Sequence, residues 1–230
     1  MSYPTVLFCN PLSETYQNHL LNTASFDYDI INFISFKEVH TNEWLPKTTH
    51  DSEYWVFTSK KAVKAVFKHH NKLNTPKTIF CVGPKTASVI NDHELSSLIC
   101  FPNEYNSKAL IELILDSNAD RITHFRGDLS PEYLVSILKK NGLNAKGIVV
   151  YKTDKRKEKV SLDLYDGLVF MSPSVVHAFL ESNTPSSETP IFCIGKTTGI
   201  AATKSGFNKV IVTDKATFEH LVKTIEEHIL

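Results

Sequence analysis

VFTSKKAVKAVF (residues 56–67) and VFMSPSVVHAFL (residues 169–180) decide the fold of this chain, because they are two copies of one motif. A second pair, IFCVGPKTASVI (79–90) and IFCIGKTTGIAA (191–202), recurs in the same order. The copies lie 113 and 112 residues apart, about half the chain, as in a duplicated architecture. Each motif is an apolar strand that ends in a Ser, Thr or Gly turn and runs directly into a helix. Anions bind at such junctions, so the repeat predicts one ligand held between two lobes.

Strands alternate with helices outside the repeats as well. TVLFCN (5–10) predicts a buried strand, and Ser13 is a candidate N-cap for the helix that follows. Residues 28–36 predict one further strand. Later in the chain, Ser130 followed by Pro131 predicts a helix start and Gly142 a helix end. This alternation predicts an α/β protein with two Rossmann or flavodoxin-like lobes, each built on a parallel sheet.

Composition excludes several classes of protein. The 230 residues are 42% hydrophobic, with no apolar run long enough to cross a membrane and no signal peptide, so we expect a cytoplasmic protein. Lys plus Arg equals Asp plus Glu at 25 each, which argues against nucleic acid as a partner. We expect no membrane partner and a monomeric chain, because no dimer stripe is visible in the sequence.

The cysteine, histidine and glycine patterns argue against several kinds of structural and binding site. Cys9, Cys81 and Cys193 lie within predicted strands and Cys100 closes an apolar stretch, so we expect reduced core thiols and no disulfide. The histidines lack ligand spacing, so no metal site is predicted. A phosphate loop would need Gly at position 190, where the chain has Pro, and the GxGxxG dinucleotide fingerprint is absent.

Each candidate binding residue has a structural alternative. Ser59 and Ser172 follow strands and precede helices, where capping alone would explain them. The turns at 83–86 and 195–198 are more specific, because Gly lets a ligand approach the backbone and Thr adds a donor. Tyr151 ends an apolar run and could be a packed aromatic. Lys60, Lys61, Lys85 and Lys196 follow strand ends, where they could meet an anion or simply be solvated.

Six segments, taken in order, resemble the uroporphyrinogen-III synthase family over essentially the whole chain: FTSKKAV, VGPKTA, FRGDLSPEYL, VVYKT, FMSPSVV and IGKTT. Lys196 departs from the family, which usually has Pro there. The resemblance implies a discontinuous lobe of residues 1–34 with 156–230 and a second lobe of residues 37–148. Linker strands near 35–36 and 149–155 would join the two lobes.

The resemblance also implies an activity. The family closes hydroxymethylbilane, a linear tetrapyrrole with eight carboxylates, to uroporphyrinogen III with inversion of ring D and loss of water, which makes this a cyclising lyase without a cofactor. Such an enzyme mainly positions its substrate. Tyr151 is expected to assist the departing hydroxyl by hydrogen bonding, because a phenol with an ordinary pKa of about 10 is a weak acid. The expected substrate-binding residues are Ser59, Lys61, Thr86, Arg126, Ser172, Ser174, Thr197 and Thr198.

Two other functions remain open at this stage. The same junctions could build a two-lobed anion-binding or regulatory module without catalysis, because fold does not determine function. A nucleotide-binding enzyme ranks third, since both glycine fingerprints fail. Turnover separates the first two, because a binding module would keep a linear tetrapyrrole unchanged.

Overall fold

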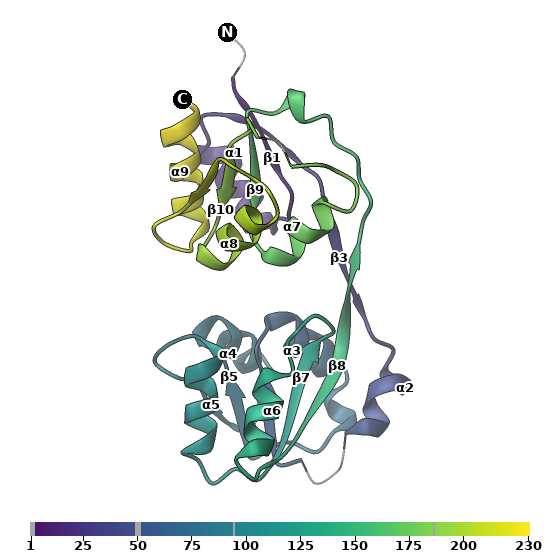
Figure 1. Ribbon diagram of the computed structural model, residues 1–230. Coiled ribbons are helices and arrows are strands. Elements are labelled where there is room, and N and C mark those ends of the chain that lie inside the picture. Colours follow the sequence, from purple (N-terminus) through teal and green to yellow (C-terminus); the bar gives the residue numbers. More distant parts are fainter. Residues whose placement is uncertain (1–2, 49–51, 94, 186) are drawn as a thin grey trace. The chain divides into compact units, whose positions relative to one another are not determined.

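The computed structural model describes residues 3–48, 52–93, 95–185 and 187–230. The chain divides into two compact units (Figure 1). Unit 1 comprises Met1–Ser35 with Asp154–Leu230, and unit 2 comprises Phe36–Thr153. The lobes and linker strands implied by the family resemblance stay a prediction.

Unit 2 contains a six-stranded sheet in the order β3-β8-β7-β4-β5-β6. The strands are β3 (Ile34–Glu38), β4 (Tyr54–Phe57), β5 (Thr78–Cys81), β6 (Leu98–Cys100), β7 (Arg121–Gly127) and β8 (Asn144–Lys155). The β4–β5, β4–β7, β5–β6 and β7–β8 pairs are parallel.

Helices cover both faces of this sheet. The helices are α2 (Thr41–Trp44), α3 (Lys60–Phe67), α4 (Pro84–Asn91), α5 (Ser107–Leu115) and α6 (Tyr133–Lys140), and the 3₁₀ turns are Leu45–Lys47 and His70–Lys72. α3 and α4 pack on one face, together with Trp44 of α2, and α5 and α6 pack on the other.

Unit 1 contains a five-stranded parallel sheet in the order β11-β10-β9-β1-β2. Its strands are β1 (Thr5–Phe8), β2 (Asp27–Ile30), β9 (Gly167–Phe170), β10 (Ile191–Cys193) and β11 (Val210–Val212). α7 (Pro173–Phe179) and α8 (Lys196–Lys204) cover one face. α1 (Glu14–Thr23) and α9 (Phe218–Ile229) cover the other, and a 3₁₀ turn spans Leu162–Leu164.

Burial on both faces explains why these strands read as continuous apolar runs in the sequence. Along β1, Val6 and Phe8 pack against α1 and α9, whereas Leu7 packs against α7 and α8. All three side chains are fully buried. Two-sided packing of this kind favours consecutive apolar residues along a strand, and not only an apolar residue at every second position.

The predicted α/β class with parallel sheets is confirmed. Both copies of each repeated motif form a strand followed directly by a helix: β4–α3 and β9–α7 for the first, β5–α4 and β10–α8 for the second. Ser13 and Thr217 cap α1 and α9 by accepting hydrogen bonds from backbone N–H groups. Gly142 follows α6 with a φ of 85°, the left-handed conformation that glycine favours at a helix end.

Two local predictions are wrong. Residues 28–36 form parts of two strands, β2 and β3, which belong to different sheets. Between them the N–H groups of Ile31 and Phe33 donate to the carbonyls of Phe8 and Cys9. An apolar, β-branched run predicts extended backbone, but it does not say which sheet the backbone joins.

The second wrong prediction is the start of α6. Ser130 and Pro131 lie in a turn before the helix, and Glu132 occupies the N-cap position. The Ser130 N–H donates to the Gly127 carbonyl, and the Arg126 guanidinium binds both the Ser130 carbonyl and the Glu132 carboxylate. These contacts, all within six residues along the chain, hold the turn in place, so the helix begins later than the Ser130-Pro131 pair indicates.

Truncation of the core of unit 1 provides a test of this packing. Phe170 is fully buried against Phe179 and Phe207, with ring centroids 5.4 and 5.6 Å away. Phe170→Ala should lower the free energy of unfolding by about 3–5 kcal/mol, because it removes buried area and leaves a cavity. Chemical denaturation measures the change, and Leu164→Ala, at an exposed position, should stay within about 0.5 kcal/mol of the wild type. A loss below about 1 kcal/mol at Phe170 would contradict the packing described here.

Candidate active site

Each unit has one point at which the order of its strands reverses. In unit 2 the chain adds β5 and β6 on one side of β4 and then places β7 on the other side. In unit 1 the chain adds β2 on one side of β1 and later places β9 on the other. Open α/β sheets bind ligands outside the carboxyl ends of the strands at such a reversal point, because the connections diverge there and leave a crevice. The two reversal points are therefore the first places to look for a site.

At the reversal point of unit 2, Tyr151 of β8 meets Ser59. The two hydroxyl oxygens lie 3.3 Å apart. Ser59 is the N-cap of α3, and its Oγ accepts the N–H of Ala62 at 3.1 Å. That capping contact fixes the serine hydroxyl, so Ser59 both starts the helix and holds the phenol. The structural and functional interpretations of Ser59 are therefore compatible.

A β-bulge aims Tyr151 at this point. Arg126 pairs with Val149 but the next residue, Gly127, pairs with Tyr151, so Val150 is the extra residue in β8. Val150 and Tyr151, although consecutive, both pack against the apolar cluster that includes α3. Such a placement needs a bulge, since side chains alternate between faces along a regular strand.

Gly127 leaves room for the tyrosine ring. A Cβ added at Gly127 would lie 2.5 Å from Cζ and 2.7 Å from the hydroxyl oxygen of Tyr151, which is closer than atoms can pack. The Asp128 N–H also donates to the Tyr151 carbonyl at 3.1 Å. Any larger residue at 127 would displace the phenol.

Lys61 and Phe36 complete this cluster. The Lys61 ammonium lies 3.0 Å above the centroid of the Phe36 ring, and that ring meets the ring of Tyr151 edge-on with centroids 6.1 Å apart. Although much of the Lys61 side chain is exposed, burial of its ammonium and, to a smaller extent, the neighbouring Lys60 charge lower its pKa to about 8. Lys61, a predicted binding residue, is thus linked to Tyr151 through the ring of Phe36.

Arg126 has partners within its own loop. Its Nη atoms bind the Ser130 carbonyl and the Glu132 carboxylate, the latter at 2.6 Å, and the side chain is nearly buried. Its guanidinium also packs closely on Gly147, where an added Cβ would lie 2.9 Å from Nε. These contacts favour a role in holding residues 127–132, so direct substrate binding by Arg126 stays a prediction.

Sequence reasoning missed a buried histidine next to Arg126. His124 lies within 3.1 Å of the Thr58 hydroxyl, measured from its Nε2. Burial, and then the charge of Arg126, lower the pKa of His124 to about 4, so the imidazole is neutral near pH 7. His124 interrupts an apolar strand in the sequence, and that interruption is the signal that could have identified it.

The predicted threonine donors in the second motif lie at helix starts. Thr86 is the third residue of α4 and Thr198 the third of α8, and both are buried. Thr197 precedes Thr198 and is exposed. α4 begins with Pro84, which has no N–H, whereas α8 begins with Lys196, which has one. The departure from the family at Lys196 therefore adds a backbone donor to the first turn of α8.

At the reversal point of unit 1, the hydroxyls of Ser172 and Ser174 lie 3.0 Å apart. Ser172 is the N-cap of α7, but its side chain makes no capping hydrogen bond. The preceding residue, Met171, donates its N–H to Oδ1 of Asn10 at 2.7 Å. Sequence reasoning missed Asn10, although a polar residue between a buried strand and Pro11 was a visible signal.

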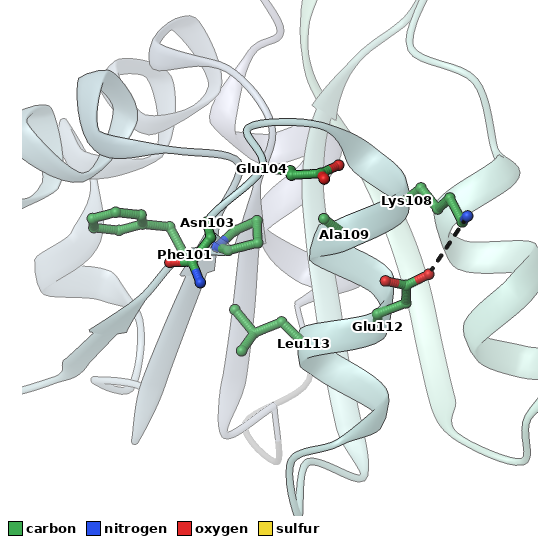
Figure 2. A pocket seen from close by; sticks show the side chains of 8 residues that line it. Phe101, Asn103, Glu104, Lys108, Ala109, Glu112 and Leu113 are labelled. Carbon is green, nitrogen blue, oxygen red and sulfur yellow. Dashed lines mark ion pairs between the residues drawn. The ribbon is translucent and has the colours of Figure 1, made fainter.

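Two hollows lie away from the reversal points. One, of about 570 Å³, is lined by Phe101, Pro102, Asn103, Glu104, Lys108, Ala109, Glu112 and Leu113 (Figure 2). The other, of about 480 Å³, is lined by Leu162, Asp163, Tyr165, Asp166, Glu188, Thr189 and Pro190. Carboxylates outnumber cations in both linings, and neither contains a predicted site residue. Neither hollow suits a polyanionic ligand.

The remaining chemistry of the described residues is limited. The four cysteines are free thiols, and Cys9, Cys81 and Cys193 are buried as predicted. Within the described ranges, no three His, Cys, Asp or Glu side chains gather in a way that could hold a metal ion. A search of the same residues finds no helix both long and apolar enough to cross a membrane.

Burial of the Lys61 ammonium, next to the charge of Lys60, predicts an unusual titration. The pKa of Lys61 in the folded chain, about 8, lies below the roughly 10.4 of an unfolded lysine. Between these values the unfolded chain binds more protons, so the contribution of Lys61 to stability rises with pH across that window. Heteronuclear NMR of labelled lysine should give a midpoint near 8, and Lys60→Gln should move the midpoint upward. A midpoint above about 10 would show that the ammonium is solvated.

Known proteins match this chain in sequence pattern and in fold. The family model described as uroporphyrinogen-III synthase HemD matches residues 18–223. The crystal structure of uroporphyrinogen-III synthetase from Helicobacter pylori superimposes with a TM-score of 0.69 at 17% identity and covers 99% of each chain. A mutant uroporphyrinogen III synthase from the extremely thermophilic bacterium Thermus thermophilus gives 0.71 at 12% identity, covering 97% of this chain and 98% of that one. No curated protein sequence matches.

The low identities to the solved structures show a shared fold alone. The family model carries more weight, because its range contains most of both units and every predicted site residue from Ser59 to Thr198. That range also includes the bulge and glycine that place Tyr151. The chain therefore belongs to the uroporphyrinogen-III synthase family.

Proposed function

We propose that this protein closes hydroxymethylbilane to uroporphyrinogen III, with inversion of ring D and loss of water, and that Tyr151 assists the loss of the hydroxyl. Membership of the family supports the reaction. The observation that carries the role of Tyr151 is its placement: a phenol aimed by a β-bulge, seated on Gly127 and hydrogen-bonded to Ser59 at a reversal point. A monomer in the cytoplasm remains our prediction.

The first chemical step breaks the bond between the substrate's hydroxymethyl carbon and its oxygen. Tyr151 donates a hydrogen bond to that oxygen as negative charge develops on it, and the oxygen leaves as water after taking up a proton from solvent. The carbon becomes an electrophile that ring D, the terminal pyrrole, attacks. Inversion then requires the bond between ring D and its bridge carbon to break and to re-form at the other α-carbon of ring D, which releases a proton and so balances the one taken up by the leaving oxygen. Because the linear molecule also closes without help, to the other isomer, the enzyme contributes mainly by fixing conformation and reacting face.

Neutral donors, together with Lys61, whose pKa is lowered, would hold the substrate carboxylates. Ser59, Thr86, Ser172, Ser174, Thr197 and Thr198 offer hydroxyls, and the first turns of α4 and α8 offer backbone N–H groups. Lys61 is charged below its pKa of about 8, so it attracts a carboxylate at neutral pH and loses that attraction as the pH rises through 8. A site of this kind binds a polyanion without giving the chain a net positive charge.

A coupled assay tests the function directly. Hydroxymethylbilane is generated enzymatically, this protein is added, the products are oxidised, and the type I and type III porphyrins are separated by chromatography. Type III should dominate, because the enzyme controls which carbon of ring D attacks the electrophile. Type I alone from folded protein would contradict the proposal and would favour a two-lobed binding module that performs no catalysis.

Replacing Tyr151 tests the proposed mechanism. Tyr151→Phe should lower kcat roughly tenfold to a hundredfold, at or below the low end of general-acid effects, because it removes one hydrogen bond to the leaving oxygen. The type III product should remain dominant, since Ser59 and the helix starts are unchanged. Tyr133→Phe, at an exposed position on α6, is the matched control and should leave kcat unchanged. If Tyr151→Phe turns over at the wild-type rate, Tyr151 has no role in the chemistry.

A further inference from the structure

Asn10 is a buried polar side chain at the reversal point of unit 1, and none of the roles assigned above uses it. It follows β1 closely and is only 8% exposed. Its Oδ1 accepts the Met171 N–H at 2.7 Å, so the contact joins the chain that leaves β1 to the chain that leaves β9. These are the two strands between which the order of the sheet reverses.

The contact with Met171 fixes which way the amide of Asn10 points. A backbone N–H can only donate, so the atom that faces it must be the oxygen of the amide. The Nδ2 group, with two hydrogens, is therefore turned away from Met171. In the part of the chain that the structure describes, no group accepts a hydrogen bond from Nδ2. Nδ2 is not one of the buried side-chain atoms that lack a partner, so it reaches solvent, where a ligand can accept its hydrogen bond.

We propose that Nδ2 of Asn10 donates a hydrogen bond to a carboxylate of the linear tetrapyrrole, which makes Asn10 a substrate-binding residue of unit 1. This inference rests on the proposed function. Two more neutral donors follow β9, the strand that Met171 leaves: the hydroxyls of Ser172 and Ser174. An amide and hydroxyls together suit a carboxylate, which accepts several hydrogen bonds at once.

The residues on either side of Asn10 bring no competing anion. The preceding residue, Cys9, is fully buried, and burial raises the pKa of its thiol well above the ordinary value, so it stays neutral. The next residue, Pro11, carries no charge and no N–H. A carboxylate near Asn10 therefore meets donors and no negative charge from these neighbours.

Asn10→Asp separates the two functions of the side chain. One carboxylate oxygen keeps the contact with the Met171 N–H, while the other replaces the NH₂ donor with a negative charge. The KM for hydroxymethylbilane should rise at least about tenfold, since a hydrogen bond to a carboxylate is lost and a repulsion is gained. The kcat should stay within about twofold and type III should remain the main product, because Asn10 holds the substrate and takes no part in the bond changes.

The matched control is Asn22→Asp, which adds the same charge to an exposed position on α1 of the same unit and should leave KM unchanged. A fluorescence titration with uroporphyrin III, a polycarboxylate that does not react, gives a second readout, and its Kd should rise with KM. If Asn10→Asp shows no cooperative thermal transition, Asn10→Ala replaces it and should also raise the KM about tenfold.

A KM and a Kd within about twofold of the wild type in a folded Asn10 variant would overturn the inference. The wild-type reaction distinguishes this failure from that of the proposed function. If the wild type forms type III and the variant matches it, only the role of Asn10 is lost. If the wild type forms type I alone, the proposed function fails and the inference fails with it.

Discussion

Hydrophobic packing on both faces of each parallel sheet is the constraint on which the rest of the structure depends. Helices cover the two faces, so every residue of the central strands β1 and β9 is apolar or glycine, apart from Thr5 where β1 begins. In unit 1 the polar side chains therefore gather at the edges at which these strands end, whereas β7 of unit 2 also buries Thr123 and His124. At the carboxyl edges the helices begin, and their unpaired N–H groups point toward any ligand. The candidate site lies at these edges, where the polar side chains that follow the strands come together.

The same constraint explains the chemistry of the site. Hydroxyls, an amide and backbone N–H groups surround the reversal points, and burial lowers the pKa of a nearby cation, Lys61. Neutral donors bind a carboxylate less tightly than fixed charges would, and substrate and product of this family's reaction carry the same carboxylates. An enzyme that must release such a product gains nothing from holding both strongly. Positioning by many weak donors suits a reaction whose uncatalysed version also proceeds.

Much of the fold follows from local sequence, and much of the site does not. The apolar strands and the serine that caps α3 could be predicted, because each depends on residues adjacent in the chain. The bulge that aims Tyr151 could not, because it depends on how Gly127 pairs with a strand formed more than twenty residues later. The orientation of the Asn10 amide depends on its hydrogen bond with Met171, 161 residues away. By contrast, the contacts through which Arg126 delays the start of α6 reach only four and six residues along the chain, but the rules for helix starts do not include them.

The discontinuity of unit 1 affects how the chain reaches its native state. Unit 2 is a single continuous stretch, so it can fold as soon as it is synthesised, whereas β1 must wait for β9, whose residues come about 160 positions later. Until then the apolar residues of β1 have no partner on that side. Pairing over so long a separation is slow, and it leaves an apolar, aggregation-prone segment exposed. The N-terminal strand is therefore the part of this protein for which a chaperone would matter most during synthesis.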